Sequence, residues 1–138
     1  MIPQWLVEKV KKFEGFDEVA FWDYKQWTNG YGTKALGPRE RITREEAEIR
    51  LAHELEKAER YVDNFARIPH EGVRCAMIDL TYNSGTAWES AGLGKLIKGG
   101  FYEAAKARLL QYNRAGGKVN KGLTARRKEE ASWFDRHD

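Results

Sequence analysis

The sequence is poor in cysteine, in histidine and in long apolar runs, and each shortage excludes a class of structure. The single cysteine, Cys75, excludes an internal disulfide. The three histidines are scattered and no Cys/His spacing resembles a ligand set, so we expect neither a metal nor a cofactor. No apolar run approaches the roughly 18–20 residues that cross a membrane. The first residues lack the basic and apolar regions of a secretory signal, so we expect synthesis in the cytoplasm.

Size and charge allow one compact domain, or two small lobes, in a chain of 138 residues. Hydrophobic residues make up 41% of the chain and include five tryptophans, enough for a core, while 33% charged residues indicate a soluble protein. The charge is uneven: residues 1–90 hold 13 Lys/Arg against 16 Asp/Glu, whereas residues 91–138 hold 11 against 5. The basic third of the chain, residues 91–138, is either an ordinary solvated helix face or a surface that binds a polyanion, such as bacterial wall or nucleic acid.

Two carboxylates and a hydroxyl form the most informative pattern. Glu14 and Asp23 stand nine positions apart, and Thr28 follows five positions later. Splitting a glycosidic bond requires one carboxyl held protonated and another held ionised. Taken singly, Glu14 would be a surface charge, Asp23 a turn residue and Thr28 a strand residue. Their combination is more informative because aromatic residues surround it: Phe13, Phe16, Phe21, Trp22, Tyr24, Trp27 and Tyr31.

The spacing of apolar residues and the positions of turn residues predict an α+β fold. We expect a helix over residues 4–13 that ends near Glu14, where the helix dipole disfavours an ionised carboxylate. Residues 16–36 predict a small antiparallel sheet of two or three strands. A capping box from Thr43 to Glu46 starts a long helix over 44–66. Further helices are expected at 71–82, 90–98, 100–113 and 124–135, with a core containing Trp88, Trp133 and Phe134 and a buried Cys75 thiol.

The stretch from Phe13 to Gly32 resembles the signature of bacteriophage-type lysozymes, the muramidases used as endolysins (glycoside hydrolase family 24). That family places eight residues between its Glu and Asp and five between its Asp and Thr; this chain has eight and four. Asn29 or a shifted turn is therefore an alternative to Thr28 at this place. Tyr82-Asn83-Ser84-Gly85 and the block Gly122-Leu123 … Arg126-Arg127 … Glu130 resemble later parts of the family.

The resemblance implies a lysozyme-like fold of 138 residues. Its N-terminal lobe would cover about 14–60, and a long helix would connect it to an all-helical lobe of about 67–138 that also takes up the N-terminal helix. It further implies hydrolysis of peptidoglycan between N-acetylmuramic acid and N-acetylglucosamine. Glu14 would be the general acid, Asp23 the ionised partner that activates water, and Thr28 the residue that holds the water. Tyr82 and Asn83 would contact sugar, and Lys118, Lys121 or Arg126 would supply a cation near the acid.

The resemblance also implies a monomer that accumulates in the host cytoplasm and reaches the wall through a membrane pore made by a partner protein (a holin). Nucleic acid is not an expected partner, because no nucleic-acid motif is present. Two alternatives stay open at this point. A lytic transglycosylase would cleave the same bond without water, and a non-catalytic module would only bind wall or nucleic acid through its basic third.

Overall fold

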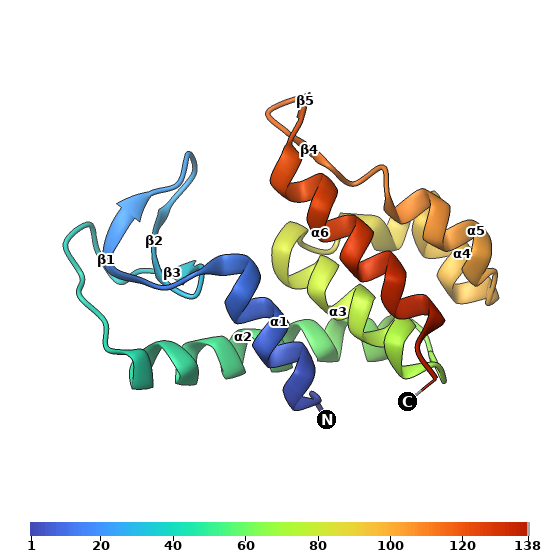
Figure 1. Cartoon of the computed structure of the whole chain (residues 1–138), viewed down its shortest axis with the longest axis horizontal. Helices are drawn as coiled ribbons and strands as arrows, with labels where there is room; N and C mark the ends of the chain where they lie inside the picture. Colours follow the sequence, from blue (N-terminus) through green and yellow to red (C-terminus); the bar gives the residue numbers. More distant parts are fainter. Residues whose placement is uncertain (138) are drawn as a thin grey trace. The chain divides into compact units, whose positions relative to one another are not determined.

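The computed structural model describes residues 1–137 and divides the chain into two compact units, residues 1–57 and 58–138 (Figure 1). The mixed helix and sheet architecture confirms the predicted α+β class. The helix α1 (Gln4–Glu14) belongs to the first unit. Our expectation that this helix packs with the helical lobe concerns the arrangement of the two units and stays a prediction.

The first unit combines α1 with a three-stranded antiparallel sheet. The strands β1 (Asp17–Trp22), β2 (Trp27–Gly30) and β3 (Thr33–Lys34) lie in chain order. The segment 40–42 adds backbone hydrogen bonds along β1, because the N–H of Ala20 donates to Glu40 and that of Ile42 donates to Glu18. Buried apolar side chains of this unit come from α1, from β1, from the segments that flank β3 and precede α2, and from the first half of α2: Leu6, Val10, Ala20, Tyr31, Ala35, Ile42, Ala47, Leu51 and Leu55.

The long helix α2 (Arg44–Phe65) runs through the boundary between the units. Its predicted capping box is present. The N–H of Glu46 donates to the Thr43 hydroxyl at 3.1 Å, and the Thr43 N–H donates to the Glu46 carboxylate at 3.3 Å. Two N-terminal donors that no helical carbonyl could reach are thereby satisfied, which fixes where the helix begins.

The second unit contains the remaining helices. They are α3 (Glu71–Ser84), α4 (Gly92–Gly99), α5 (Tyr102–Leu109) and α6 (Lys121–Ser132), with short 3-10 turns η1 (Ala87–Ser90) and η2 (Trp133–Asp135). Trp88 is 1% exposed, Trp133 2% and Phe134 8%, so the predicted core residues are confirmed. The Trp88 indole N–H donates to the Thr81 hydroxyl at 3.0 Å, which satisfies its polar atom inside this core. Cys75 is fully buried, as expected.

The second unit differs from the prediction in its last two helices. The helix expected over 124–135 begins at Lys121 and ends at Ser132. The helix expected over 100–113 ends at Leu109, and a small hairpin follows, formed by β4 (Arg114–Ala115) and β5 (Lys118–Val119). Gly116 and Gly117 make its turn with φ angles of +59° and +81°, which glycine adopts without strain. The lobe is therefore helical apart from this hairpin.

Among residues 1–137, no helix combines the length and the apolar character that membrane crossing requires. The same residues contain no group of three or more His, Cys, Asp and Glu side chains arranged to hold a metal ion.

Candidate functional site

Glu14 is the last residue of α1, where the structure places it against the backbone of Gly32. A Cβ atom built on Gly32 would lie 2.4 Å from Glu14 Oε1 and 2.9 Å from its Cδ. Gly32 also has a φ of +83°, so a larger residue there would be strained and would displace the Glu14 carboxyl group. The half-buried carboxyl group of Glu14 is thus packed on the loop between β2 and β3.

Asp23 lies in the four-residue loop, 23–26, that connects β1 to β2. Its backbone N–H donates to the Gln26 carbonyl at 3.0 Å, and its carboxylate Oδ1 accepts from the N–H of Lys25 at 3.1 Å and of Gln26 at 2.9 Å. An aspartate that binds its own following backbone in this way fixes a turn. Tyr24, inside the loop, has a φ of +89°, a conformation rare for residues with a side chain. The loop therefore holds the carboxylate in one orientation.

Thr28 lies on β2 and is only 5% exposed. Its hydroxyl donates to Asp23 Oδ2 at 2.6 Å, and the Gln26 amide donates to the same hydroxyl at 3.5 Å. Partial burial raises the pKa of Asp23, but the hydrogen bonds from Thr28 and from two backbone N–H groups outweigh it, so the pKa lies below its ordinary value. The shorter Asp–Thr gap of this chain therefore still brings the two side chains together.

The idea that Asn29 could stand in for Thr28 is wrong. Asn29 is fully buried, and its amide donates to the Glu40 backbone carbonyl at 3.3 Å and to the Glu40 carboxylate at 3.2 Å. Adjacent residues of a strand point to opposite faces, so Asn29 and Thr28 cannot occupy the same place.

Sequence reasoning missed the group that supports the sheet, which is Glu40. Its carboxylate accepts two hydrogen bonds from Arg50 at 2.7 and 2.6 Å, and one from the Leu36 N–H at 3.0 Å. The paired Arg50 guanidinium lowers the pKa of Glu40 to about 2, despite some desolvation. Nothing in the sequence indicates this pairing, because Glu40 lies in an irregular segment ten residues before Arg50.

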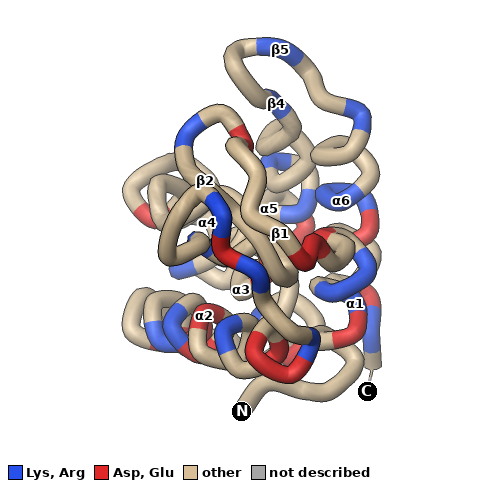
Figure 2. Tube along the Cα trace, turned by 90° about the vertical axis from the view of Figure 1, so that its left-hand side faces the viewer, with Lys and Arg blue, Asp and Glu red and all other residues tan. Residues whose placement is uncertain are grey.

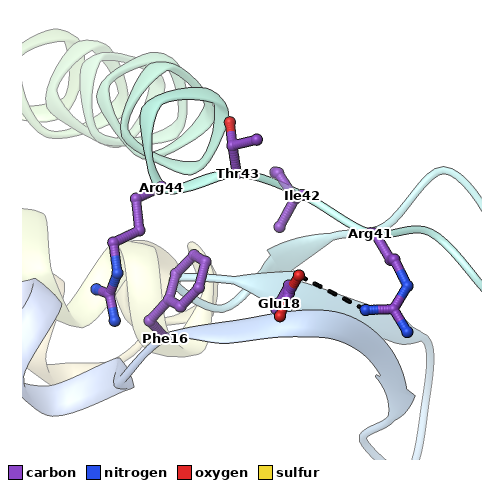
Figure 3. A pocket seen from close by; sticks show the side chains of 6 residues that line it. All are labelled: Phe16, Glu18, Arg41, Ile42, Thr43 and Arg44. Atoms are coloured by element: carbon purple, nitrogen blue, oxygen red, sulfur yellow. Dashed lines mark ion pairs between the residues drawn. The ribbon is translucent and has the colours of Figure 1, made fainter.

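A hollow of about 600 Å³ lies elsewhere on the first unit, between Phe16 and the start of α2 (Figure 3). The Arg44 guanidinium carbon stands 4.3 Å from the centroid of the Phe16 ring, and Arg41 pairs with Glu18 at 3.5 Å. None of the predicted site residues lines this hollow, and its charged groups engage each other or an aromatic ring.

Tyr82 and Asn83 lie near the C-terminal end of α3, in the second unit. The Asn83 carbonyl oxygen accepts from the Arg127 guanidinium and, at 3.4 Å, from the Ser84 hydroxyl. Asn83 therefore positions the buried Arg127 guanidinium. The contact of Tyr82 and Asn83 with sugar stays a prediction.

The two arginines of α6 that resemble the family's C-terminal block, Arg126 and Arg127, are buried. Arg126 donates to both oxygens of Asp79, at 2.9 and 2.7 Å, and Arg127 lies 2.9 Å from Glu130. Burial and the Asp79 charge raise the pKa of Glu130 well above its ordinary value, and a hydrogen bond between the two carboxyl groups lowers that of Asp79 despite burial. Sequence spacing alone gave no sign of this four-residue cluster.

The basic C-terminal third, residues 91–138, exposes fewer positive charges than its count of Lys and Arg indicates. Lys and Arg follow the β4–β5 hairpin and α6 (Figure 2), but Arg126 is 6% exposed and Arg127 fully buried. Lys118 and Lys121, the other candidates for a cation beside the acid, are exposed. Two of the eleven basic residues thus serve the interior of the second unit.

Comparison with known proteins gives consistent relatives. Residues 11–130 match the family model described as phage lysozyme. The endolysins of Bacillus phages B103 and PZA are 29% and 30% identical over 93% and 94% of this chain. The chain spans about half the length of these two relatives, 51% and 53%. The structure of the endolysin from Escherichia coli O157:H7 phage FAHEc1 matches with a TM-score of 0.85 and 25% identity, covering 100% of this chain and 95% of that one.

Proposed function

The chain belongs to the phage lysozyme family, and we therefore propose that it is an endolysin that hydrolyses peptidoglycan. The bond cleaved is the β-1,4 link between N-acetylmuramic acid and N-acetylglucosamine. The observation that carries the proposal is the Asp23 carboxylate, which accepts hydrogen bonds from the Thr28 hydroxyl and from the N–H groups of Lys25 and Gln26. These donors favour the ionised form that hydrolysis requires of one of two carboxyl groups.

In the proposed reaction, Glu14 donates a proton to the leaving glycosidic oxygen. Its place at the carboxyl end of α1 and against Gly32 supports this role, because the helix dipole there favours a neutral carboxyl group. Bond breaking leaves positive charge on the sugar ring, which the ionised Asp23 stabilises. Asp23 then accepts a proton from the attacking water as a general base.

Thr28 contributes in two ways to this proposal. Its single hydroxyl proton is donated to Asp23, so the hydroxyl faces other groups as an acceptor, as the hydrogen bond from Gln26 illustrates. A water that donates to Thr28 would be held beside the Asp23 carboxylate. Tyr82 and Asn83 are proposed as further contacts with the glycan strand.

The proposed biological setting is lysis of a bacterial host. The protein would accumulate as a monomer in the host cytoplasm and reach the wall through a membrane pore formed by a partner protein. Neither a metal nor another cofactor takes part in the proposed reaction.

The decisive test is digestion of purified cell walls by the wild type and by Glu14→Gln. We expect the variant to fold, to bind walls and to lose nearly all clearing, because an amide cannot donate the required proton. Glu8→Gln, which changes an exposed glutamate on the same helix, is the matched control and should clear walls normally. Clearing by Glu14→Gln at the control rate would overturn the assignment of the acid.

Product masses separate the two enzymatic possibilities. Hydrolysis adds one water to each cleaved bond, whereas a transglycosylase leaves an anhydro-sugar that is one water lighter. We expect the heavier product from the wild type. A wild type that binds walls without releasing any product would instead indicate a non-catalytic binding module.

A further inference from the structure

The hairpin of β1 and β2 presents aromatic side chains on both of its faces. Phe21 is 43% exposed and Trp22 is 56% exposed, although they are neighbours on the same strand. Phe21 pairs with Thr28 across the hairpin, and Trp22 pairs with Trp27. Directly paired residues share a face, whereas neighbours along a strand point to opposite faces. Phe21 therefore lies on the face of Thr28, and Trp22 lies with Trp27 on the other.

The Asp23 carboxylate lies on the Phe21 face as well, because it accepts the Thr28 hydroxyl at 2.6 Å. Directly paired residues have Cβ atoms about 4.5–5.5 Å apart, so the Phe21 side chain leaves the strand next to Thr28, on the face that carries the Asp23 carboxylate. An exposed phenyl ring beside an ionised, hydrogen-bonded carboxylate offers a flat apolar surface next to a reacting group.

On the opposite face of the hairpin, the two tryptophan rings contact each other. The Trp22 and Trp27 rings meet edge to face, with centroids 5.7 Å apart and an interplanar angle of 68°. Such a cross-strand aromatic pair stabilises the hairpin itself. The Trp22–Trp27 contact is thus explained within the hairpin, whereas the exposure of Phe21 on the side of Asp23 is not.

We propose that Phe21 is a saccharide-binding residue, which receives the apolar C–H face of a pyranose ring of the glycan strand beside Asp23. This inference rests on the proposed function. The occupant is a neutral sugar ring because a phenyl group provides contact area and no hydrogen bond or charge. Phe21 therefore contributes to substrate affinity and takes no part in proton transfer.

The test compares Phe21→Leu with Trp22→Leu. Both substitutions remove an exposed flat ring from β1 and keep an aliphatic side chain, but they act on opposite faces of the hairpin. The substrate is soluble, uncrosslinked peptidoglycan glycan, and release of reducing ends gives kcat and KM separately. Thermal unfolding of each variant reports the structural effect.

We expect Phe21→Leu to raise KM about fivefold with little change in kcat, because the lost ring contact weakens binding before and during reaction alike. Phe21→Tyr, which keeps the ring, should retain the wild-type KM. Trp22→Leu should lower thermal stability and leave KM unchanged. An unchanged KM in Phe21→Leu, equal rises in both leucine variants, or a fall in kcat alone would overturn the proposal.

These outcomes are separate from those that test the overall function. If Glu14→Gln loses activity and Phe21→Leu keeps its KM, the saccharide contact is refuted and hydrolysis stands. If Glu14→Gln remains fully active, the proposed reaction fails whatever Phe21 does.

Discussion

The hydrogen bond from Thr28 to Asp23 makes a measurable contribution to keeping Asp23 ionised. A hydrogen bond to a charged group contributes about 1.5–3 kcal/mol, and one pKa unit corresponds to about 1.4 kcal/mol. Because Asp23 is half-buried and two backbone donors remain, we take the lower end of that range. Thr28→Val, which keeps the shape of the buried side chain, should therefore raise the pKa of Asp23 by about one unit.

The sign of the effect follows from the ionised role of Asp23. Its pKa is lowered in the folded protein, so activity that requires the carboxylate is lost as pH falls through that pKa. In Thr28→Val the acidic limb of the pH profile of kcat/KM should move about one unit to higher pH. NMR titration of the Asp23 carboxyl carbon in the inactive Glu14→Gln background measures the same shift without catalysis.

Thr33→Val is the matched control for this experiment. Thr33 is also 5% exposed on a strand of the same sheet, but its hydroxyl donates to the Asn29 carbonyl at 3.5 Å. The control should leave the acidic limb in place. A folded Thr28→Val enzyme with an unmoved limb, or an equal shift in both variants, would refute the reasoning.

Two further predictions concern stability. Because Arg50 lowers the pKa of Glu40 to about 2, the stabilisation that Glu40 gives is complete above its ordinary pKa and is lost as pH falls toward 2. Glu40→Gln should thus be less stable than wild type by about 1–2 kcal/mol in urea unfolding at pH 6, allowing for partial solvent contact, and this difference should vanish near pH 2. Arg127→Met should cost about 3–5 kcal/mol because it leaves the oxygens of Asn83, Ser84 and Glu130 without their buried guanidinium donor. An Arg127→Met variant that is as stable as the surface control Lys128→Met would contradict this account.

The elements that were predicted correctly are those whose signals are local. The capping box at Thr43 and Glu46 fixed the start of α2 because both partners lie within one helical turn. Likewise, glycine and turn residues between aromatic runs indicated the hairpin around Asp23. Pairing Asp23 with Thr28 also needed only a short loop, so their meeting could be expected from the chain itself.

The features that escaped prediction depend on contacts between distant segments. Charge counting treated Arg126 and Arg127 as surface residues, because a sequence does not show that Asp79, 47 positions before Arg126, reaches it inside the core. Asn29 was misjudged for a related reason. Its partner Glu40 becomes adjacent only when the irregular segment before α2 packs along β1.

The shortened gap between Asp23 and Thr28 can be tested as a question of strand geometry. Although the gap is one residue shorter than in the family pattern, the pairing of Trp22 with Trp27 and of Phe21 with Thr28 keeps Thr28 on the face of Asp23. Two insertions of one residue would each restore the family spacing, yet they differ in consequence. A glycine between Lys25 and Gln26 lengthens only the loop, and we expect activity within a few-fold of wild type.

A residue inserted between Trp27 and Thr28 instead lengthens the strand. With the Trp22–Trp27 pair kept, every residue after the insertion turns to the opposite face, because side chains alternate with a period of two. Thr28 would then point away from Asp23, and the buried Asn29 would lose Glu40. We expect this variant to lose nearly all wall-clearing activity and to unfold at a lower temperature. Equal activity in the two insertion variants would show that spacing, and not the face of the strand, determines the placement of Thr28.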